Sequence, residues 1–163
     1  MDLIVKRRSI RKYKETAVEE DKIQKILEAI RLAPSALNRQ GWVFYVVRDR
    51  ERIQRVADAA GIFPWLYRVP VILVGCGTTH ECMTNKHNSD TVDVSIAMSF
   101  AMLEAQEQGL GTCWMAHFDP DKMRKALDAD ENENPVVLMP LGYADEHPAA
   151  RKRKEIAEIA RFM

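Results

Sequence analysis

Three uninterrupted apolar segments constrain the fold more than any other feature of the sequence. They read GWVFYVV, PVILVGCG and PVVLMPLGY, and they cover residues 41–47, 70–77 and 135–143. Each is rich in β-branched, aromatic or aliphatic residues and lacks the alternation of polar and apolar residues that marks a half-exposed strand. Pro70 is compatible with a strand only at its beginning, which is where it stands. The segments therefore predict strands of a sheet that is covered on both faces.

The stretches between these strands favour helices. Ile23, Ile26 and Ile30 recur three or four residues apart, which predicts a helix over residues 18–32 that ends before Pro34. Asp119 as N-cap, followed by Pro120 in the first helical position, is a strong helix start. Other expected elements are helices over 50–60, 90–108 and 119–127, a short strand over 111–115, and a final charged helix or arm over 151–162. Because helices and strands do not alternate strictly, we expect one α+β domain over residues 1–163.

Charge and cysteine content exclude several classes of protein. The 24 lysines and arginines balance the 24 aspartates and glutamates, whereas a general nucleic-acid or membrane-surface protein is usually basic. Two of the three cysteines, Cys76 and Cys113, stand in apolar runs and are expected to behave as small hydrophobes. The longest apolar run, residues 69–76, is too short to span a bilayer, and the N-terminus lacks a signal-peptide core. We therefore expect a cytoplasmic protein with reduced thiols.

The usual catalytic and metal-binding signatures are missing. No serine stands in a G-x-S-x-G elbow, and no cysteine has a recognisable histidine partner. The cluster of His80, Glu81, Cys82 and His87 matches no zinc spacing, so we interpret it as a polar surface loop and expect no metal. The glycines of the GCG sequence, residues 75–77, lack the third glycine of a dinucleotide-binding turn and are expected only to end a strand.

Two basic clusters remain, near opposite ends of the chain. The first, KRRSIRKY, contains Arg7, Arg8, Ser9 and Arg11, and the second is RKRK at residues 151–154. Either cluster alone is typical of a solvated helix end. Arginine forks beside a serine hydroxyl nevertheless suit the oxygens of a phosphate. If the chain ends meet in space, the two clusters could hold one phosphate together.

A polar loop precedes the first predicted strand. It reads APSALNRQGW, and its amides and hydroxyl at Ser35, Asn38 and Gln40 could read the donor and acceptor edge of a planar heterocycle. The alternative is a capped loop whose side chains satisfy its own backbone.

Five segments in order resemble the nitroreductase family of flavoproteins: RRSIRKY, LAPSALNRQGWVFYVV, GLGTCWM, LGYADEHP and RKRKEIAEIARF. The resemblance covers nearly the whole chain. It implies an α+β fold with a central mixed sheet flanked by helices. It also implies a homodimer with FMN at the subunit interface. No contact with nucleic acid or membrane is expected.

The resemblance also implies roles for individual residues. Arg11 is expected at the electron-rich edge of the flavin ring, where a cation stabilises the reduced form, and the backbone N–H of Ala116 or His117 is expected at flavin N5. These three are the implied catalytic residues. The loop from Pro34 to Asn38 is contributed by the other subunit. The implied FMN-binding residues are Arg7, Arg8, Ser9, Arg11, Pro34, Ser35, Ala36, Asn38, Trp114, Met115, Ala116, Arg151 and Arg153.

By resemblance, the activity is FMN-dependent transfer of hydride from NADH or NADPH, by a ping-pong mechanism, to a nitroaromatic, a quinone or a similar small acceptor. Two alternatives stay open: a flavin-binding or redox-sensing protein without turnover, and a partner-binding or nucleic-acid-binding protein that uses its basic termini. Three departures from the family pattern concern Ala36, which replaces a second serine, Gly41, which replaces a proline, and the short segment over residues 78–90. For Gly41 we expect an effect on loop stiffness alone.

Overall fold

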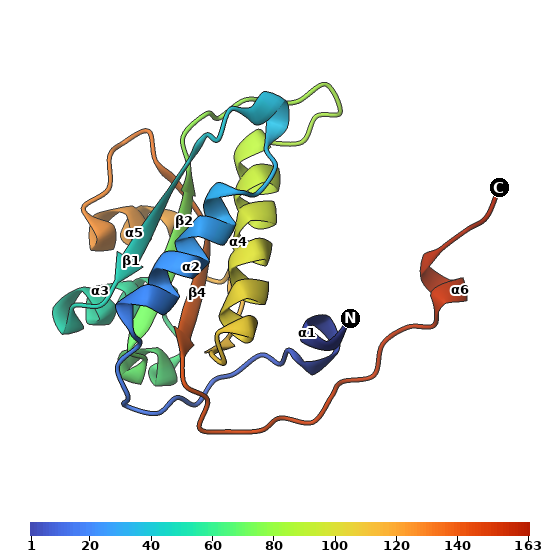
Figure 1. Cartoon of the computed structure of the whole chain (residues 1–163). Coiled ribbons are helices and arrows are strands. Elements are labelled where there is room, and N and C mark those ends of the chain that lie inside the picture. Colours follow the sequence, from blue (N-terminus) through green and yellow to red (C-terminus); the bar gives the residue numbers. More distant parts are fainter.

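A four-stranded sheet forms the centre of the computed structural model, which describes all 163 residues. The strand order is β1-β2-β4-β3, and every neighbouring pair is antiparallel. Helices α2 and α4 cover one face of the sheet, and α3 and α5 cover the other (Figure 1). In chain order the elements are α1 (Asp2–Lys6), α2 (Glu20–Arg31), η1 (Ala36–Asn38), β1 (Trp42–Val47), α3 (Arg50–Ala60), η2 (Pro64–Arg68), β2 (Val71–Gly77), α4 (Ser89–Glu107), β3 (Gly111–Thr112), α5 (Pro120–Leu127), β4 (Asn134–Gly142) and α6 (Ile156–Ile159).

The sheet separates two hydrophobic cores, because successive residues of a strand point to opposite faces. Ile72 and Leu138 pack with α3 and α5, whereas Leu73 and Met139 pack with α2 and α4. Strand β2 is buried along its whole length. Each such aliphatic side chain contributes about 1.5–3 kcal/mol through removal from water. The prediction that both faces of the sheet are covered is confirmed.

The elements predicted from the apolar pattern are observed with small shifts at their ends. The carboxylate of Asp119 accepts hydrogen bonds from the backbone N–H groups of Asp121 and Lys122, both at 3.0 Å, and so caps α5 as expected. The strand expected over residues 111–115 is shorter, because regular pairing stops at Thr112 and resumes only as an isolated bridge at Met115. Helix α1 was not predicted by the sequence pattern.

The sheet differs in one respect from the mixed sheet that the resemblance implied. All four strands of the chain are antiparallel, and the parallel pairing is confined to a single bridge between Ser9 and Thr112. The reason is local: only Ile10 donates its N–H to the carbonyl of Thr112, at 2.8 Å, before the chain turns away. The N-terminal segment thus lies along β3 without becoming a strand.

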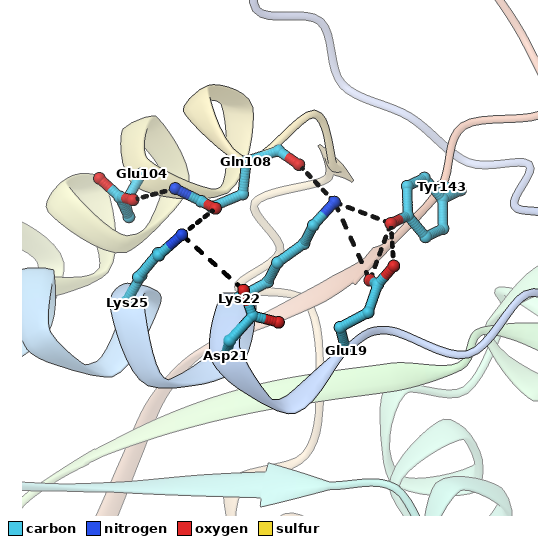
Figure 2. Close-up of polar contacts among 7 residues, drawn as sticks. All are labelled: Glu19, Asp21, Lys22, Lys25, Glu104, Gln108 and Tyr143. Atoms are coloured by element: carbon cyan, nitrogen blue, oxygen red, sulfur yellow. Dashed lines mark hydrogen bonds and ion pairs between the residues drawn. The ribbon is translucent and has the colours of Figure 1, made fainter.

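A polar network ties the start of α2 to the ends of α4 and β4 (Figure 2). The ammonium of Lys22 donates to the carbonyl of Gln108 at 3.0 Å and to the hydroxyl of Tyr143 at 2.8 Å. The Tyr143 hydroxyl in turn donates to the carboxylate of Glu19, and Lys25 donates to the side chain of Gln108. The network fixes the point at which the chain leaves β4 for the C-terminal segment.

The C-terminal segment beyond residue 146 leaves the body of the molecule as an extended arm (Figure 1). Its only helix is the four-residue α6. Of the two possibilities that we expected for residues 151–162, a helix or an arm, the structure shows mainly an arm. The apolar side chains of Ile156, Ile159 and Phe162 are exposed. None of the helices of the chain has the length and apolar character that crossing a membrane requires.

Candidate functional site

The two basic clusters line one cleft of about 490 Å³, although they are far apart in sequence. Arg7, Ser9 and Arg11 face it from the N-terminal segment, and Arg151 and Arg153 face it from the C-terminal arm. No carboxylate lines the cleft. We call it the arginine cleft, and its full lining is Ile4, Val5, Arg7, Arg8, Ser9, Arg11, Pro148, Ala149, Ala150, Arg151 and Arg153.

Backbone contacts hold the N-terminal wall of the arginine cleft against the sheet. Ile10 is buried against β3, and a side chain at Gly111 would come within 2.7 Å of Ile10 Cγ1, so this close approach needs glycine. Glu146 accepts hydrogen bonds from the backbone N–H groups of Arg11, at 2.5 Å, and Lys12, at 3.2 Å. The carboxylate of Glu146 thereby joins the segment before the arm to the N-terminal cluster.

The arginines of the arginine cleft differ in what they already bind. The guanidinium of Arg8 donates to the carbonyls of Val5, at 2.6 Å, and Arg7, at 2.9 Å, and so satisfies acceptors at the end of α1. The side chains of the other four arginines make no hydrogen bond or ion pair within the chain: Arg7, Arg11, Arg151 and Arg153. Arg8 therefore supports the wall of the cleft, whereas the other four present free donors to a ligand.

A second cleft, of about 540 Å³, adjoins the first and shares Arg11 with it. Trp65 and Tyr13 line it with their rings stacked, at 6.3 Å between centroids and 30° between planes. The row of rings continues edge to face from Trp65 to Phe63 and from Phe63 to His117. We call this the aromatic cleft; its lining is Arg11, Lys12, Tyr13, Lys14, Glu15, Pro64, Trp65, Arg68 and Asp145.

Burial sets the protonation of the tyrosine in this row. The hydroxyl of Tyr13 donates to the carbonyl of Ile10 at 2.6 Å. Removal from water, followed by the neighbouring Cys113 thiol, raises the pKa of Tyr13 above its usual value. Tyr13 thus remains a neutral donor that fixes the turn beside Arg11.

The segment from Trp114 to His117 presents free backbone donors at the far end of the aromatic row. Met115 exchanges two backbone hydrogen bonds with Leu138, at 3.0 and 2.9 Å, which anchors the segment to β4. Ala116 and His117 are exposed, and neither of their backbone N–H groups donates within the chain. Trp114 is half-buried against the α2 and α4 core. The anchored Met115 therefore holds two adjacent N–H groups ready for an external acceptor.

The loop around η1 lies at the other end of the molecule (Figure 1). The N–H of Ala36 donates to both carboxylate oxygens of Asp93, at 3.1 and 3.2 Å, next to the start of α4, whereas the arginine cleft lies past its end. The 19 residues of α4 span roughly 28 Å. Pro34, Ser35, Ala36 and Asn38 thus do not meet the arginine cleft within one chain.

Comparison with known proteins decides the family. The model of the nitroreductase family matches residues 4–64 and 58–143. The chain belongs to the nitroreductase family. It is 30% identical over 167 residues to the FMN reductase [NAD(P)H] of Bacillus subtilis, covering 91% of this chain and 65% of that protein. A protein of Methanothermobacter thermautotrophicus with the provisional name NADH dehydrogenase/NAD(P)H nitroreductase is 33% identical over 156 residues, 93% of this chain and 80% of its own.

Solved structures agree on the nitroreductase fold. A nitroreductase family protein from Clostridium difficile 630 superposes with a TM-score of 0.89 at 29% identity, over 99% of this chain and 96% of that one. An FMN-dependent nitroreductase from Clostridium difficile R20291 superposes with a TM-score of 0.79 at 30% identity, over 96% and 92% of the two chains. The α+β class and the nitroreductase-like arrangement are confirmed.

Two of the three departures from the family pattern, Gly41 and the segment over residues 78–90, contact each other in the structure. Gly41 is buried, and a Cβ there would lie 2.1 Å from Thr79 Cγ2. The glycine is therefore required by packing against the segment over residues 78–90, which is more than the effect on stiffness that we expected. That segment is folded onto Asp90, whose Oδ1 accepts from the N–H groups of Thr79 and His80.

Two residues that contact candidate site residues, Asp93 and Trp65, were not predicted from the sequence. Asp93 positions Ala36. The feature of the sequence that could have indicated it is a carboxylate on the buried side of a largely apolar helix. Trp65 lies in a stretch of the sequence to which we assigned no element, and no local pattern indicates that its ring would meet Tyr13. The polar residues around His80 are exposed as expected, although the Nδ1 of His80 lies 2.6 Å from Asp90 Oδ2 and its Nε2 lies 2.5 Å from the carbonyl of Asn132.

Proposed function

We propose that this nitroreductase is an FMN-dependent oxidoreductase that takes electrons from NADH or NADPH. It passes them to a nitroaromatic, a quinone or a similar small acceptor in a ping-pong cycle, and it works as a homodimer. The names of its relatives, among them an FMN reductase [NAD(P)H] and an FMN-dependent nitroreductase, support the cofactor and the donor.

The arginine cleft is the single observation that carries the proposal. A phosphate monoester has about two negative charges at neutral pH and three oxygens that accept hydrogen bonds. Four arginines without side-chain partners in the chain and the unbonded hydroxyl of Ser9 provide matching donors, and no carboxylate lines the cleft to oppose them. The chemistry of this donor set therefore fits the phosphate of FMN.

The remaining residues are arranged to serve the ring of the flavin. Bound FMN supplies hydride acceptance from the nicotinamide and reduction of the acceptor. Arg11, shared by the two clefts, places a cation where negative charge grows on the ring, and a preorganised charge of this kind lowers a barrier by a few kcal/mol. The exposed N–H groups of Ala116 and His117 orient the reacting edge. No side chain of the site has to donate or accept a proton in this scheme.

A second copy of the chain completes the site. Ser35, Ala36 and Asn38 lie roughly the length of α4 away from the arginine cleft, so they reach a flavin only across an interface. The exposed apolar side chains of the arm, Ile156 and Ile159, are 72% and 71% accessible and find no cover in their own chain. Packing of this arm on a partner would bury them and bring Arg151 and Arg153 into a fixed position.

Colour and electron transfer test the proposal. Pure protein titrated with FMN is expected to become yellow, and NADH or NADPH is expected to bleach it under anaerobic conditions. Colourless protein that takes up no FMN contradicts the proposal, and yellow protein that no donor bleaches leaves the flavin-binding or redox-sensing alternative. Sedimentation checks the assembly, since a stable monomer with bound FMN contradicts the shared site.

Paired substitutions test the phosphate contacts. Arg7→Ala combined with Arg153→Ala is expected to weaken FMN binding about a hundredfold, since it removes two charge-assisted contacts. The matched control is Lys152→Ala combined with Lys154→Ala, which removes two charges from the same arm at residues that do not line the cleft. Equal flavin occupancy in the two variants would show that the phosphate lies elsewhere.

A further inference from the structure

We propose that the aromatic cleft is a binding subsite for electron acceptors that carry a carboxylate on an aromatic ring. The inference rests on the proposed function, because the subsite presents an acceptor beside the flavin that the arginine cleft would hold. Two properties of the cleft carry it: an excess of unpaired positive charge, and a stacked aromatic wall.

The charges of the aromatic cleft do not cancel. Lys12 and Asp145 form an ion pair at 2.9 Å, which raises the pKa of the Lys12 ammonium and lowers that of the Asp145 carboxyl. The side chains of Arg11, Lys14 and Arg68 make no hydrogen bond or ion pair within the chain, and Glu15 is the one carboxylate left without a partner. Three free cations against one free anion favour an anionic ligand.

The aromatic wall selects a planar ligand. Trp65 is half-buried, stacked on Tyr13 and braced edge to face by Phe63, so its position is fixed before any ligand arrives. Offset or edge contact with such a ring favours another aromatic ring beyond the effect of the apolar area that is buried. The row of rings leads from the cleft toward His117, where the free backbone donors lie.

The dimensions favour the acceptor over the nicotinamide dinucleotide. A cleft of about 540 Å³ is in the range that encloses a drug-sized molecule, whereas a dinucleotide with its two ribose phosphates would extend well outside it. Arg11 belongs to both clefts, so an acid group held near Lys14 and Arg68 leaves the other end of the acceptor ring directed toward the flavin edge.

Matched acceptors provide the test. 4-Nitrobenzoate and 4-nitrobenzamide differ at one group, a carboxylate in the first and a neutral amide in the second. In each reduction the nitro group takes up two electrons and two protons and becomes a nitroso group with release of water. The donor loses a hydride, and the second proton comes from solvent. The measured quantity is the ratio of kcat/KM for the benzoate to kcat/KM for the benzamide.

Charge variants of the cleft are expected to move this ratio in opposite directions. Lys14→Gln combined with Arg68→Gln is expected to lower it about tenfold, the combined effect of two partly exposed charge contacts. Glu15→Gln is expected to raise it about twofold. Lys122→Gln combined with Lys125→Gln removes the same charge from a different surface and is expected to leave it unchanged. In the wild type, 0.5 M NaCl is expected to lower the ratio.

A binding measurement separates this inference from the proposed function. Titration calorimetry of oxidised protein with 4-nitrobenzoate needs no turnover, and binding is expected to be about tenfold weaker in the Lys14→Gln, Arg68→Gln variant and also weaker in Trp65→Leu. If donors bleach the flavin but the charge variants change neither the ratio nor the binding, the subsite is refuted and the proposed function stands. If no donor bleaches the flavin but 4-nitrobenzoate binds and the charge variant weakens its binding, the proposed function fails and the anion subsite stands.

Discussion

In this member of the nitroreductase family, the body of the chain contains the buried cores, whereas the two termini contain the proposed binding site. Every buried residue lies between Ile10 and Gly142, and none lies in the first nine residues or in the arm beyond residue 146. The arginine cleft is nevertheless lined almost entirely by those two terminal segments. The comparison shows that the charges which we propose for the cofactor lie in the part of the chain that buries no residue of its own. Their order has to come from the ligand or from a second copy.

Removal of the arm is expected to produce the largest effect. A chain that ends at Glu146 loses Arg151, Arg153 and the apolar side chains of α6, but it keeps both hydrophobic cores. We expect FMN affinity to fall about a hundredfold or more, with conversion of the dimer to a monomer. The measurements are the ratio of flavin to protein absorbance and sedimentation velocity.

The same truncated chain also tests whether the body folds and keeps its stability without the arm. Its far-ultraviolet circular dichroism and its urea midpoint without FMN are expected to match those of the full-length apoprotein, because no buried side chain is removed. Cooperative unfolding that disappears on truncation would contradict the division between body and arm.

A substitution in the core is expected to lower stability and to leave FMN binding unchanged. Leu138 of β4 is fully buried in the core between the sheet and helices α3 and α5. Leu138→Ala is expected to lower the free energy of unfolding by about 3 kcal/mol. The molecules that stay folded are expected to bind FMN with unchanged stoichiometry. Urea unfolding measures the first effect and flavin titration the second; a folded variant that binds no FMN would argue against the separation.

The sequence predicts the body of the chain better than it predicts the site at the termini. The apolar pattern places α2, β2 and β4 correctly, by helical periodicity in α2 and by uninterrupted apolar runs in the two strands, since burial of those side chains in this one chain decides their structure. The meeting of Arg7 with Arg153 leaves no periodic trace in the sequence, and it was inferred only from charge and from family resemblance. Helix α1 has five residues and buries none of them, so it is too short to show a hydrophobic stripe in the sequence. Asp93 and Trp65 depend on contacts across the fold, which local sequence does not encode.

The loop around η1 belongs to the body and lies far from the arginine cleft. A substitution that loosens this loop tests whether it also contributes to FMN binding. Asp93→Ala removes the carboxylate that holds the N–H of Ala36, and we expect a loss of about 2 kcal/mol in the free energy of unfolding. Flavin affinity is expected to fall as well if the loop reaches FMN in the partner. Glu107→Ala, an exposed change on the same helix, is the control and is expected to alter neither quantity. An Asp93→Ala dimer with normal FMN affinity would place the loop outside the site.

The smallest expected effect lies in the body and appears only at alkaline pH. Burial, followed by the nearby Glu133 carboxylate, raises the pKa of the Cys76 thiol to about 12, above the value near 9 that it has when exposed. The unfolded chain therefore releases this proton first, and the free energy of unfolding falls as pH rises above 9 toward the folded pKa. Between pH 8 and pH 10 the contribution of this thiol amounts to about 1 kcal/mol.

Cysteine variants isolate that contribution. Cys76→Ala is expected to be less stable than the wild type at pH 8, because it leaves a small cavity, and to lose less of its stability between pH 8 and pH 10. Cys82 is exposed, so Cys82→Ala is expected to keep the wild-type pH dependence. Urea denaturation with a reducing agent at both pH values measures the slopes. Equal slopes in all three proteins would mean that the Cys76 thiol titrates alike in the folded and unfolded chain, and the core beside β2 would then have to admit water.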